Sequence, residues 1–559
     1  MDILQTLTDD VINKSLDPQL VRVLVGLIEH LINENNQLKE SLQNARDEIN
    51  RLKGEQGKVK ISKSKKGGNT DISSEKERNQ NNPPKHRGRG ERNDNVEITE
   101  HRICRLPKDE LPDDVRFTGY EINIVQDIRI VTNNVRLYRE SYYSPSLKKT
   151  FTAPRPEGFE GEFGPGIRSL ILALKGLCNV SEPSIHAILT AFNCYISPAT
   201  ISRLSREDTL SFSEEKTEII KAGLLSTPYQ HIDDTGARVN GALYKTHILC
   251  NPFYTAYFTC PHKDRLTILK LLVMNQELHY LFDDTAFALM ATLKIPAQIQ
   301  QYLKESTTPH CMSDADLQPI LDLIPTKNKD PQTLYRKIKE AAAISWYQKQ
   351  DEWPVVQCLV SDDAPQFRHI TVEHALCWIH AGRTLKKLTP ITPFFKTEVS
   401  TVLSEFWDLY HALLDYKESP DEQRKGYLEE RFDALSLRKS EFKPLQSALE
   451  TIAANKEKLL VVLRFPEIPL HNNPAELGAR SQVRKRDVSL HTISKDGTEA
   501  VDVLLTLVQT AKKLGVNVYH YIQDSLTERK MERIHITLLK KAGLPLQNND
   551  STFAQGVGR

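Results

Sequence analysis

The feature that most constrains the fold is a succession of three strand-like runs followed by a helix-like one. The three runs are YQHIDDTGARV, GALYKTHILCN and YTAYFTC, which begin at Tyr229, Gly241 and Tyr254. They are rich in β-branched and aromatic residues and are separated by glycine, asparagine and proline, which is typical of strands joined by turns. The run LTILKLLVM then has the length and apolar content of a helix. This part of the chain therefore predicts an α/β fold.

Later segments extend this pattern. VVQCLVSDDA predicts a buried strand that ends in carboxylates, and HALCWIHAGRTLKKL predicts a strand or turn leading into a helix. EAVDVLLTLVQTAKKLG predicts a further helix. Three strands, a helix, a fourth strand and later helices are the order of the ribonuclease-H-like fold. We expect this core at residues 226–520, with helical insertions at about 275–350 and 391–465, and a helical tail at 521–559.

The N-terminal region predicts a coiled coil at residues 1–53. Apolar residues recur there at alternating steps of four and three, which is a heptad pattern, and Asn35 occupies one of the a positions. A single asparagine at an a position favours a parallel two-stranded register. The alternative is a helix that packs on its own domain. We expect self-association, to a homodimer or a higher oligomer.

Three further regions precede the predicted core. Residues 54–95 are basic and nearly devoid of large apolar side chains, so we expect a disordered linker that either contacts phosphates or only keeps the chain soluble. Residues 96–160 alternate apolar and polar side chains, which predicts a small β-rich domain. Residues 161–225 predict short helices resembling a helix-turn-helix, in which Ser197 caps the last helix and Arg203 reads DNA; an ordinary helical hairpin is the alternative.

Composition narrows the class of protein. The 559 residues are 39% hydrophobic and 26% charged, with a formal net charge of +1, as in ordinary soluble proteins. No apolar run reaches the roughly 18–20 residues of a membrane-spanning helix, and the acidic N-terminus is unlike a secretory signal. The eight cysteines form no CxxC pair, so a reducing cytoplasm is expected rather than a disulfide framework or a zinc ribbon.

Five carboxylates stand where strands end or a helix begins. Asp233 and Asp234 lie at the end of the first strand, Asp362 and Asp363 end the fourth, and Glu476 opens a late helix. Such positions can converge although they are far apart in sequence. Oxygen ligands suit Mg²⁺ or Mn²⁺, and two such ions can clamp the oxygens of a phosphoryl displacement. The sequence therefore predicts a two-ion site for a phosphate polymer.

The stretch LHNNPAELGARSQVRKR places Glu476 among many positive charges. Asn472 and Asn473 are predicted to cap the helix, and Pro474 suits its first turn. The basic residues that follow are predicted to bind the phosphates of the polymer being cut: Arg480, Arg484, Lys485 and Arg486. A capped surface helix with solvated charges is the alternative for this stretch taken alone.

Several motifs together resemble the IS66-type transposases, bacterial DDE enzymes with a ribonuclease-H-like core. The motifs are HIDDTG, SDDAPQF, CWIHAGR, HNNPAELGAR and DGTEA followed by LLTLVQTAKKLG. The resemblance places the three catalytic and metal-binding acids on Asp233, Asp362 and Glu476, with Asp363 as the rival for the second. It implies Mg²⁺- or Mn²⁺-dependent strand cleavage and strand transfer at terminal inverted repeats, into target DNA. It also implies companion proteins of the same element.

The remaining motif residues carry less specific expectations. Asp234, Asp363, Asn472 and Asn473 are possible supports of the site, and His380 and Arg383 are expected to contact substrate or order the metal ligands. Cys377 and Trp378 match the family signature, but core packing is the expected role. Two departures bear on end recognition: the family's DNN reads HNN here, and Leu477 replaces the common arginine. The paired cysteines of a zinc-binding segment are absent, with Cys104 alone in that region.

Two other functions fit the same residues. The chain could be a catalytically inactive, transposase-derived DNA-binding protein, which the retained acids disfavour. It could also be a ribonuclease-H-like nuclease that cleaves RNA–DNA hybrids without joining strands. A divalent-ion-dependent strand-transfer assay separates these functions.

Overall fold

A computed structural model gives the architecture of the chain. The structure describes residues 26–28, 31–32, 34–35, 38–39, 41–42, 96–106, 116–156, 158–159, 161–274, 276–307, 310–324, 331–527 and 529–546. The described residues between 26 and 42 are helical, and the heptad residues Leu31, Leu38 and Leu42 are exposed. Most of the predicted coiled coil and the whole 54–95 linker lie outside the described residues. The pairing of two chains through this helix stays a prediction.

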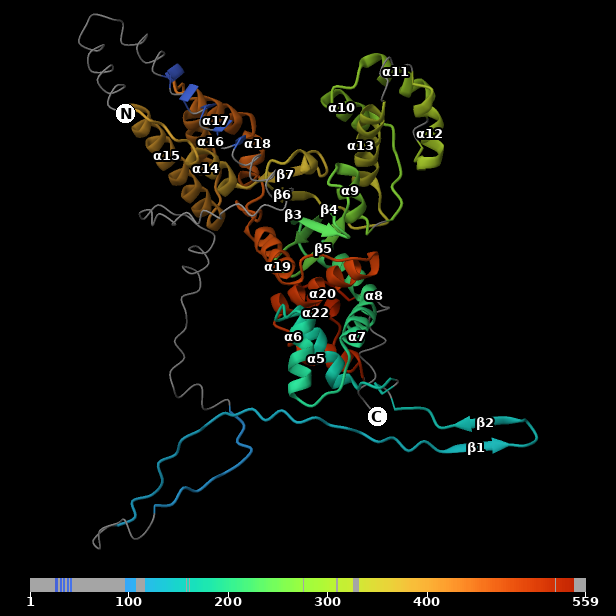
Figure 1. Cartoon of the computed structure of the whole chain (residues 1–559). Coiled ribbons are helices and arrows are strands. Elements are labelled where there is room, and N and C mark those ends of the chain that lie inside the picture. Colours follow the sequence, from blue (N-terminus) through green and yellow to red (C-terminus); the bar gives the residue numbers. More distant parts are fainter. Residues whose placement is uncertain are drawn as a thin grey trace, which may run out of the picture. The chain divides into compact units, whose positions relative to one another are not determined.

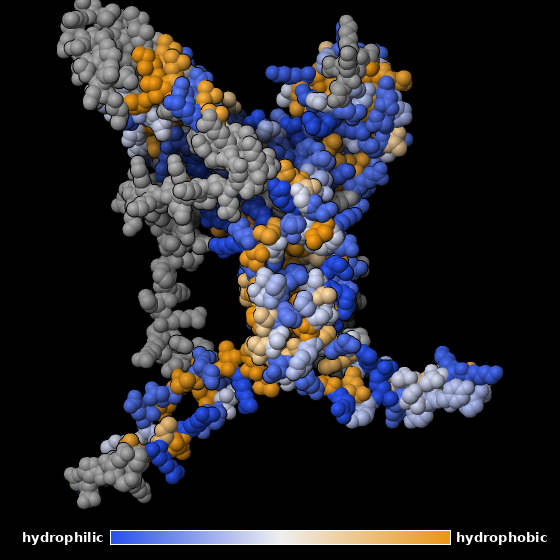
Figure 2. Space-filling model, in the orientation of Figure 1, coloured by the Kyte–Doolittle hydropathy of each residue, from blue (hydrophilic) through white to orange (hydrophobic). Residues whose placement is uncertain are grey.

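The region predicted to be a small β-rich domain differs from that prediction. Residues 116–140 contain no helix or strand, and the regular structure is a hairpin of β1 (Ser141–Ser144) and β2 (Lys149–Thr152). The alternating apolar side chains find nothing to pack against, so Ile122, Val125 and Ile128 are more than four-fifths exposed. Figure 2 shows apolar residues of this segment at the surface. A strand pattern needs a partner sheet, which the described part of this segment lacks.

Four helices lead into the central sheet: α5 (Pro165–Gly176), α6 (Glu182–Ala191), α7 (Pro198–Leu210) and α8 (Ser213–Leu225). The predicted cap of α7 is confirmed, because the Ser197 side chain accepts a hydrogen bond from the Thr200 backbone N–H and Pro198 occupies the first turn. Both α7 and α8 pack on α20.

The predicted α/β character is confirmed by a five-stranded mixed sheet (Figure 1). Its order is β5 (Thr255–Cys260), β4 (Ala242–Cys250), β3 (Tyr229–Val239), β6 (Cys358–Ser361) and β7 (Glu373–Leu376). Strands β3, β4 and β5 pair antiparallel, whereas β3, β6 and β7 pair parallel. Parallel neighbours end at the same edge, so residues that follow β6 lie beside the middle of the longer β3.

Two groups of helices stand between strands of this sheet or follow it. Before β6 come α9 (Arg265–Leu272), α10 (Asp284–Thr292), α11 (Ala297–Ser306), α12 (Asp314–Asp322) and α13 (Gln332–Lys349). After β6 come η2 (Pro365–Phe367) and, beyond β7, α14 (Trp378–Lys386), α15 (Pro393–Glu418), α16 (Glu422–Ser436), α17 (Lys443–Ala454), α18 (Lys456–Leu459) and η3 (Val461–Leu463). The indole of Trp378 is fully buried against Phe406, so its expected core role is confirmed.

The last helices are α19 (Asn473–Ser489), α20 (Lys495–Leu514), α21 (Val518–Ser525) and α22 (Ile534–Lys541). Helix α19 packs on β3 and β4, and α20 packs on β5 (Figure 1). Ser494 caps the start of α20, and Gly515, with φ of 69°, ends it in the left-handed conformation that glycine tolerates best. None of the helices in the described ranges combines the length and apolar content needed to span a lipid bilayer.

Both faces of the sheet are buried. Leu249 of β4 packs in the large core that includes Ile232 and Phe258, whereas its neighbour Ile248 packs on the opposite face with Tyr257 and Leu505. This alternation follows from the two-residue period of a strand.

Gly478 sets how closely α19 approaches the sheet. A Cβ atom at this position would lie 2.7 Å from the Ile248 Cγ2 and 3.3 Å from the Thr255 Cγ2. Contacts this short force atoms in a packed interior to move. The glycine therefore lets α19 lie directly on β4.

We expect Gly478→Ala to lower the free energy of unfolding by about 1–3 kcal/mol, because the added methyl overpacks the α19–sheet interface. Gly426→Ala in α16 is the matched control, since a Cβ there meets nothing within 4 Å. That control is expected to raise stability by about 0.5–1 kcal/mol through lower unfolded-state entropy. Urea titrations measure both changes. Equal shifts in the two variants would contradict the packing argument.

Candidate active site

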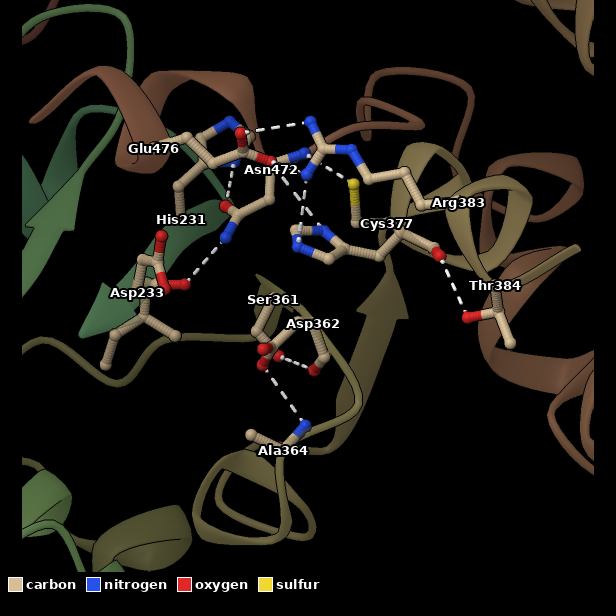
Figure 3. Close-up of polar contacts among 12 residues, drawn as sticks. His231, Asp233, Ser361, Asp362, Ala364, Cys377, Arg383, Thr384, Asn472 and Glu476 are labelled. Carbon is tan, nitrogen blue, oxygen red and sulfur yellow. Dashed lines mark hydrogen bonds and ion pairs between the residues drawn. The ribbon is translucent and has the colours of Figure 1, made fainter. Parts of the chain in front are cut away.

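Three acidic side chains converge from a strand, a loop and a helix. Strands β3 and β6 are in parallel register with His231 beside Val360. Continued by two residues, that register places Asp233 of β3 beside Asp362, which follows β6. Glu476 lies in the first turn of α19, the helix packed on β3. Figure 3 shows Asp233, Asp362 and Glu476 brought into one region.

The electrostatics of Asp233 reflect this crowding. Burial is the largest cause that raises the pKa of its carboxyl, and the negative charges of Asp362, Asp234 and Glu476 add to it. A hydrogen bond from the Asp234 backbone N–H, 2.8 Å long, opposes the shift. The net result is a pKa raised from 3.8 to about 7. A cation placed among these carboxylates would offset the unfavourable charge.

The two neighbouring aspartates are already paired. Asp234 accepts from the Lys245 Nζ at 2.8 Å and from the Gln366 Nε2 at 2.9 Å, one on each carboxylate oxygen. Asp363 likewise accepts from the Arg368 Nε at 3.0 Å and from the Asn455 Nδ2 at 3.3 Å.

In contrast, neither Asp233 nor Asp362 forms an ion pair with any residue that the structure describes. Asp362 accepts a hydrogen bond from the Ala364 backbone N–H at 3.1 Å. This difference favours Asp362 over Asp363 as the second acid of the group.

Glu476 is held by two basic side chains of α14. The Arg383 Nη1 and Nη2 atoms lie 3.3 Å from the two carboxylate oxygens in a bidentate arrangement, and the His380 Nδ1 lies 3.7 Å from one of them. Burial lowers the pKa of His380, and the Glu476 charge partly opposes this. Both residues predicted to order the site therefore contact its third acid.

Cys377, His380 and Glu476 also have ligand atoms within 4.8 Å of one another, the spacing of a metal site. One observation speaks against an ion bound by these three residues. Burial raises the pKa of the Cys377 thiol to about 11, so the thiolate that binds metals is scarce at neutral pH. The three acids Asp233, Asp362 and Glu476 do not form a group this tight among the described residues, so one ion would not contact all three in this conformation.

Asn472 joins the segments that carry the acids (Figure 3). Its Nδ2 donates to the Ile232 carbonyl at 2.8 Å, and its Oδ1 lies 3.0 Å from the His231 Nδ1. Its carbonyl accepts from the Glu476 backbone N–H at 3.2 Å, and its own N–H donates to the Cys377 Sγ at 3.3 Å. The predicted capping role is therefore wrong: the Asn472 side chain makes no cap hydrogen bond because the strand uses it.

These contacts also fix the protonation of His231. A backbone carbonyl can only accept, so the Asn472 amide must present its NH₂ to Ile232 and its oxygen to His231. The His231 Nδ1 therefore carries a hydrogen. Burial lowers the pKa of His231 to about 3, so the ring is neutral. The sequence offered little sign of this role, because His231 stood out only as a flank of the acidic pair.

The other predicted site residues are spread over the fold. Arg203 is half-exposed on α7 and pairs with Glu207 at 2.7 Å. Arg480 and Arg484 are exposed on α19, one turn apart, and form no ion pair with another described residue. Asn473 is buried, and its Oδ1 meets no donor within the described ranges.

Lys485 and Arg486 have internal partners. Lys485 is 4% exposed and donates to the Lys175 carbonyl at 2.9 Å. Arg486 is half-buried and donates to the Gly236 carbonyl of β3. These two side chains therefore do not belong to the exposed face that Arg480 and Arg484 present.

Comparisons with known proteins identify the family of the chain. Residues 340–500 match the family model described as the transposase IS66 family, a range that includes Asp362, the CWIH residues and Glu476. The chain is also 33% identical over 317 residues to the uncharacterized protein y4jO of Sinorhizobium fredii (strain NBRC 101917 / NGR234). That similarity covers 55% of this chain and 94% of y4jO.

The raised pKa of Asp233 predicts a pH-dependent cost to folding. The unfolded carboxyl ionises near pH 4 but the folded one near pH 7, so the folded state binds more protons and stability falls as pH rises through this window. Asp233→Asn removes the charge and should stabilise the protein at pH 8, by about 1.4 kcal/mol for each pKa unit of the shift. The gain should vanish by pH 4. Urea titrations between pH 4 and 8, in the presence of a chelator, measure it.

Asp234→Asn is the control for this experiment. It weakens the contacts with Lys245 and Gln366 and should destabilise the protein at pH 8. If Asp233→Asn also destabilises at pH 8, the raised pKa is incorrect.

Proposed function

Because the chain belongs to the IS66 family of transposases, we propose that it is a DNA transposase that cleaves and joins strands at the ends of a mobile element. The observation that carries the proposal is the convergence of Asp233, Asp362 and Glu476 from three separate elements. A protein that only bound DNA would have no use for this convergence. In such a protein, repulsion among the three carboxylates would lower the folding stability without serving any function.

The sheet supports a ribonuclease-H-like catalytic core. Its order is β5-β4-β3-β6-β7, and its first three strands are followed along the chain by helices and then by β6, which agrees with the succession of elements expected for that core. In this arrangement Asp233 lies in the central strand, Asp362 follows its parallel neighbour, and Glu476 begins a helix that packs on the same strand. Asp233 and Glu476 therefore belong to regular elements, and Asp362 directly follows one.

The donor set fits divalent cations. Asp233 and Asp362 offer carboxylate oxygens that form no ion pair with a lysine, arginine or histidine side chain in the described ranges. Glu476 offers a third carboxylate. Oxygen ligands of this kind suit Mg²⁺ or Mn²⁺. Asp233, Asp362 and Glu476 would hold two such ions between them. Bound there, such ions would activate water or a 3′-hydroxyl and neutralise charge on the phosphate that is transferred.

The protein's own residues would position the reacting strand. Arg480 and Arg484 extend from Glu476 along the exposed face of α19, where guanidinium groups can bind successive phosphates. Arg383 orients the Glu476 carboxylate through two contacts, and Asn472 fixes the backbone that carries it. Catalysis would then rest on positioning and on charge neutralisation, without a covalent protein intermediate. Terminal repeats and target DNA are the proposed substrates, and the N-terminal helix would bring two protomers together.

We expect Asp233→Asn, Asp362→Asn and Glu476→Gln each to reduce strand cleavage and joining by at least about a hundredfold, because each removes a charged metal ligand. The assay uses the full-length chain, a DNA duplex that carries the terminal inverted repeat flanking the gene, and Mg²⁺ or Mn²⁺. DNA affinity measured without divalent ions should stay within about threefold of the parent. The activity should be absent when the ions are chelated.

Asp363→Asn is the matched control, since it makes the same chemical change one residue from Asp362 in a side chain already paired with Arg368. It should keep activity within about tenfold of the parent. Cleavage of RNA–DNA hybrids without strand joining would favour a nuclease instead. Binding without any ion-dependent chemistry would favour an inactive DNA-binding protein.

A further inference from the structure

The carboxylate of Glu476 contacts helix α14 rather than the other two acids. Both of its oxygens accept from the Arg383 guanidinium, at 3.3 Å each (Figure 3). Glu476 also forms a close group of ligand atoms with two residues at the start of α14, and neither Asp233 nor Asp362 joins such a group in the described ranges. Glu476 therefore has a guanidinium as its partner, although the proposed function requires it to bind a metal ion.

The contact between Arg383 and Glu476 is loose enough to be exchanged. Charge-assisted N–H···O bonds are usually about 2.7–2.9 Å long, and both bonds here are longer, at 3.3 Å. The Arg383 side chain is 42% exposed, so water and dissolved anions can compete for it. Ion pairs with an exposed partner contribute little to stability. The guanidinium can therefore leave Glu476 for another anion at small cost.

The same contact opposes a metal ion on Glu476. A bidentate guanidinium uses both carboxylate oxygens and places a full positive charge beside them. Among the described side chains, Arg383 is the permanently charged partner of Glu476, because the other contact is the His380 ring at 3.7 Å. Two cations close to one carboxylate repel each other. Glu476 can therefore bind Arg383 or a divalent ion well, but not both.

The surroundings of Arg383 suit a DNA phosphate. Lys387 lies four residues after Arg383 on the same face of α14, is exposed, and forms no ion pair with another described residue. On α19, the exposed Arg480 lies four residues after Glu476, so a phosphate bound by Arg480 would lie beside the carboxylate that Arg383 contacts. A phosphate accepts a guanidinium in the same bidentate way as a carboxylate.

We propose that Arg383 binds a phosphate of the DNA and holds Glu476 only until that phosphate arrives. DNA binding thereby releases Glu476 for the metal ions, so the acidic site binds ions more tightly when its substrate is present. By thermodynamic linkage, the ions then tighten DNA binding by the same factor. The inference rests on the proposed function and deepens it, since it assigns Arg383 to the substrate and makes ion binding depend on DNA.

Mn²⁺ binding to the full-length chain without DNA tests the contact with Glu476. The dissociation constant is obtained from the electron paramagnetic resonance signal of free Mn²⁺, and circular dichroism confirms that each variant is folded. Arg383→Gln should bind Mn²⁺ about three- to tenfold more tightly than the parent, because the guanidinium no longer competes for Glu476. Lys387→Gln is the matched control, since it removes the same charge from the same helix face without a contact to Glu476. It should stay within about twofold of the parent.

A double variant shows whether the effect acts through Glu476. In a Glu476→Gln background, Arg383→Gln should leave the Mn²⁺ affinity within about twofold. If Arg383 only oriented its acid, Arg383→Gln would instead weaken Mn²⁺ binding, since losing such a support typically costs about 10- to 100-fold. A weakened or unchanged Mn²⁺ affinity in Arg383→Gln overturns the inference. A gain that persists in the Glu476→Gln background overturns it as well.

DNA binding tests the phosphate contact. The probe is a fluorescein-labelled duplex that carries the terminal inverted repeat. With Mn²⁺ present, Arg383→Gln should bind it about three- to tenfold more weakly than the parent and lower the slope of log affinity against log salt by about one. With a chelator the loss should be smaller, because the guanidinium of the parent is then shared with Glu476. Equal losses in both conditions, or no loss in either, would contradict the exchange.

The outcome is separable from that of the proposed function, because neither binding measurement depends on catalysis. If both expected results are obtained but the parent performs no strand transfer, the exchange at Arg383 stands and the transposase proposal is refuted. If the parent performs strand transfer but Arg383→Gln does not bind Mn²⁺ more tightly, the exchange alone is refuted.

Discussion

The acidic site depends on the hydrogen bonds of one buried amide, that of Asn472. Its side chain holds the strand that carries Asp233, its carbonyl holds the first turn that carries Glu476, and its N–H contacts the start of the helix that carries Arg383. Segments more than 200 residues apart in the sequence are thereby held together by the hydrogen bonds of one residue. The amide is 1% exposed, so no water competes for these bonds. The HNN motif is best understood as this connection rather than as a helix cap.

The charges around the site follow a division among five acids. Asp234, Asp363 and Glu476 each face a basic side chain, whereas Asp233 and Asp362 face none that the structure describes. A fold that needed only stability would pair or replace all five, because a buried unpaired carboxylate is costly. The fold instead pairs Asp234, Asp363 and Glu476 with basic side chains and leaves Asp233 and Asp362 unpaired beside each other. The raised pKa of Asp233 is the measure of that cost.

Sequence reasoning located the parts of this site more reliably than their contacts. The strand pattern around Asp233 and Asp362 and the helix that begins at Asn473 depend on local periodicity, which a single sequence displays. The partners of Asn472 could not be predicted this way, because an asparagine before a helix satisfies the same local pattern whether it caps the helix or bonds to a strand. The same holds for Lys485, whose burial depends on how α19 lies against α5. The alternation at residues 116–140 was a true pattern without the partner that a strand requires.

The order of charged residues along α19 needs a physical explanation. An acid in the first turn and basic residues toward the end favour any helix through its dipole, so Glu476 and Arg486 alone would need no functional explanation. The dipole does not explain why Lys485 is buried, with its pKa lowered to about 8, or why Gln482 keeps an unpaired oxygen beside it. Both features cost folding free energy and gain nothing from the helix itself. The bond from the Lys485 Nζ to the Lys175 carbonyl ties α19 to the end of α5, so packing between these two helices, rather than the stability of α19 alone, accounts for the burial of this ammonium.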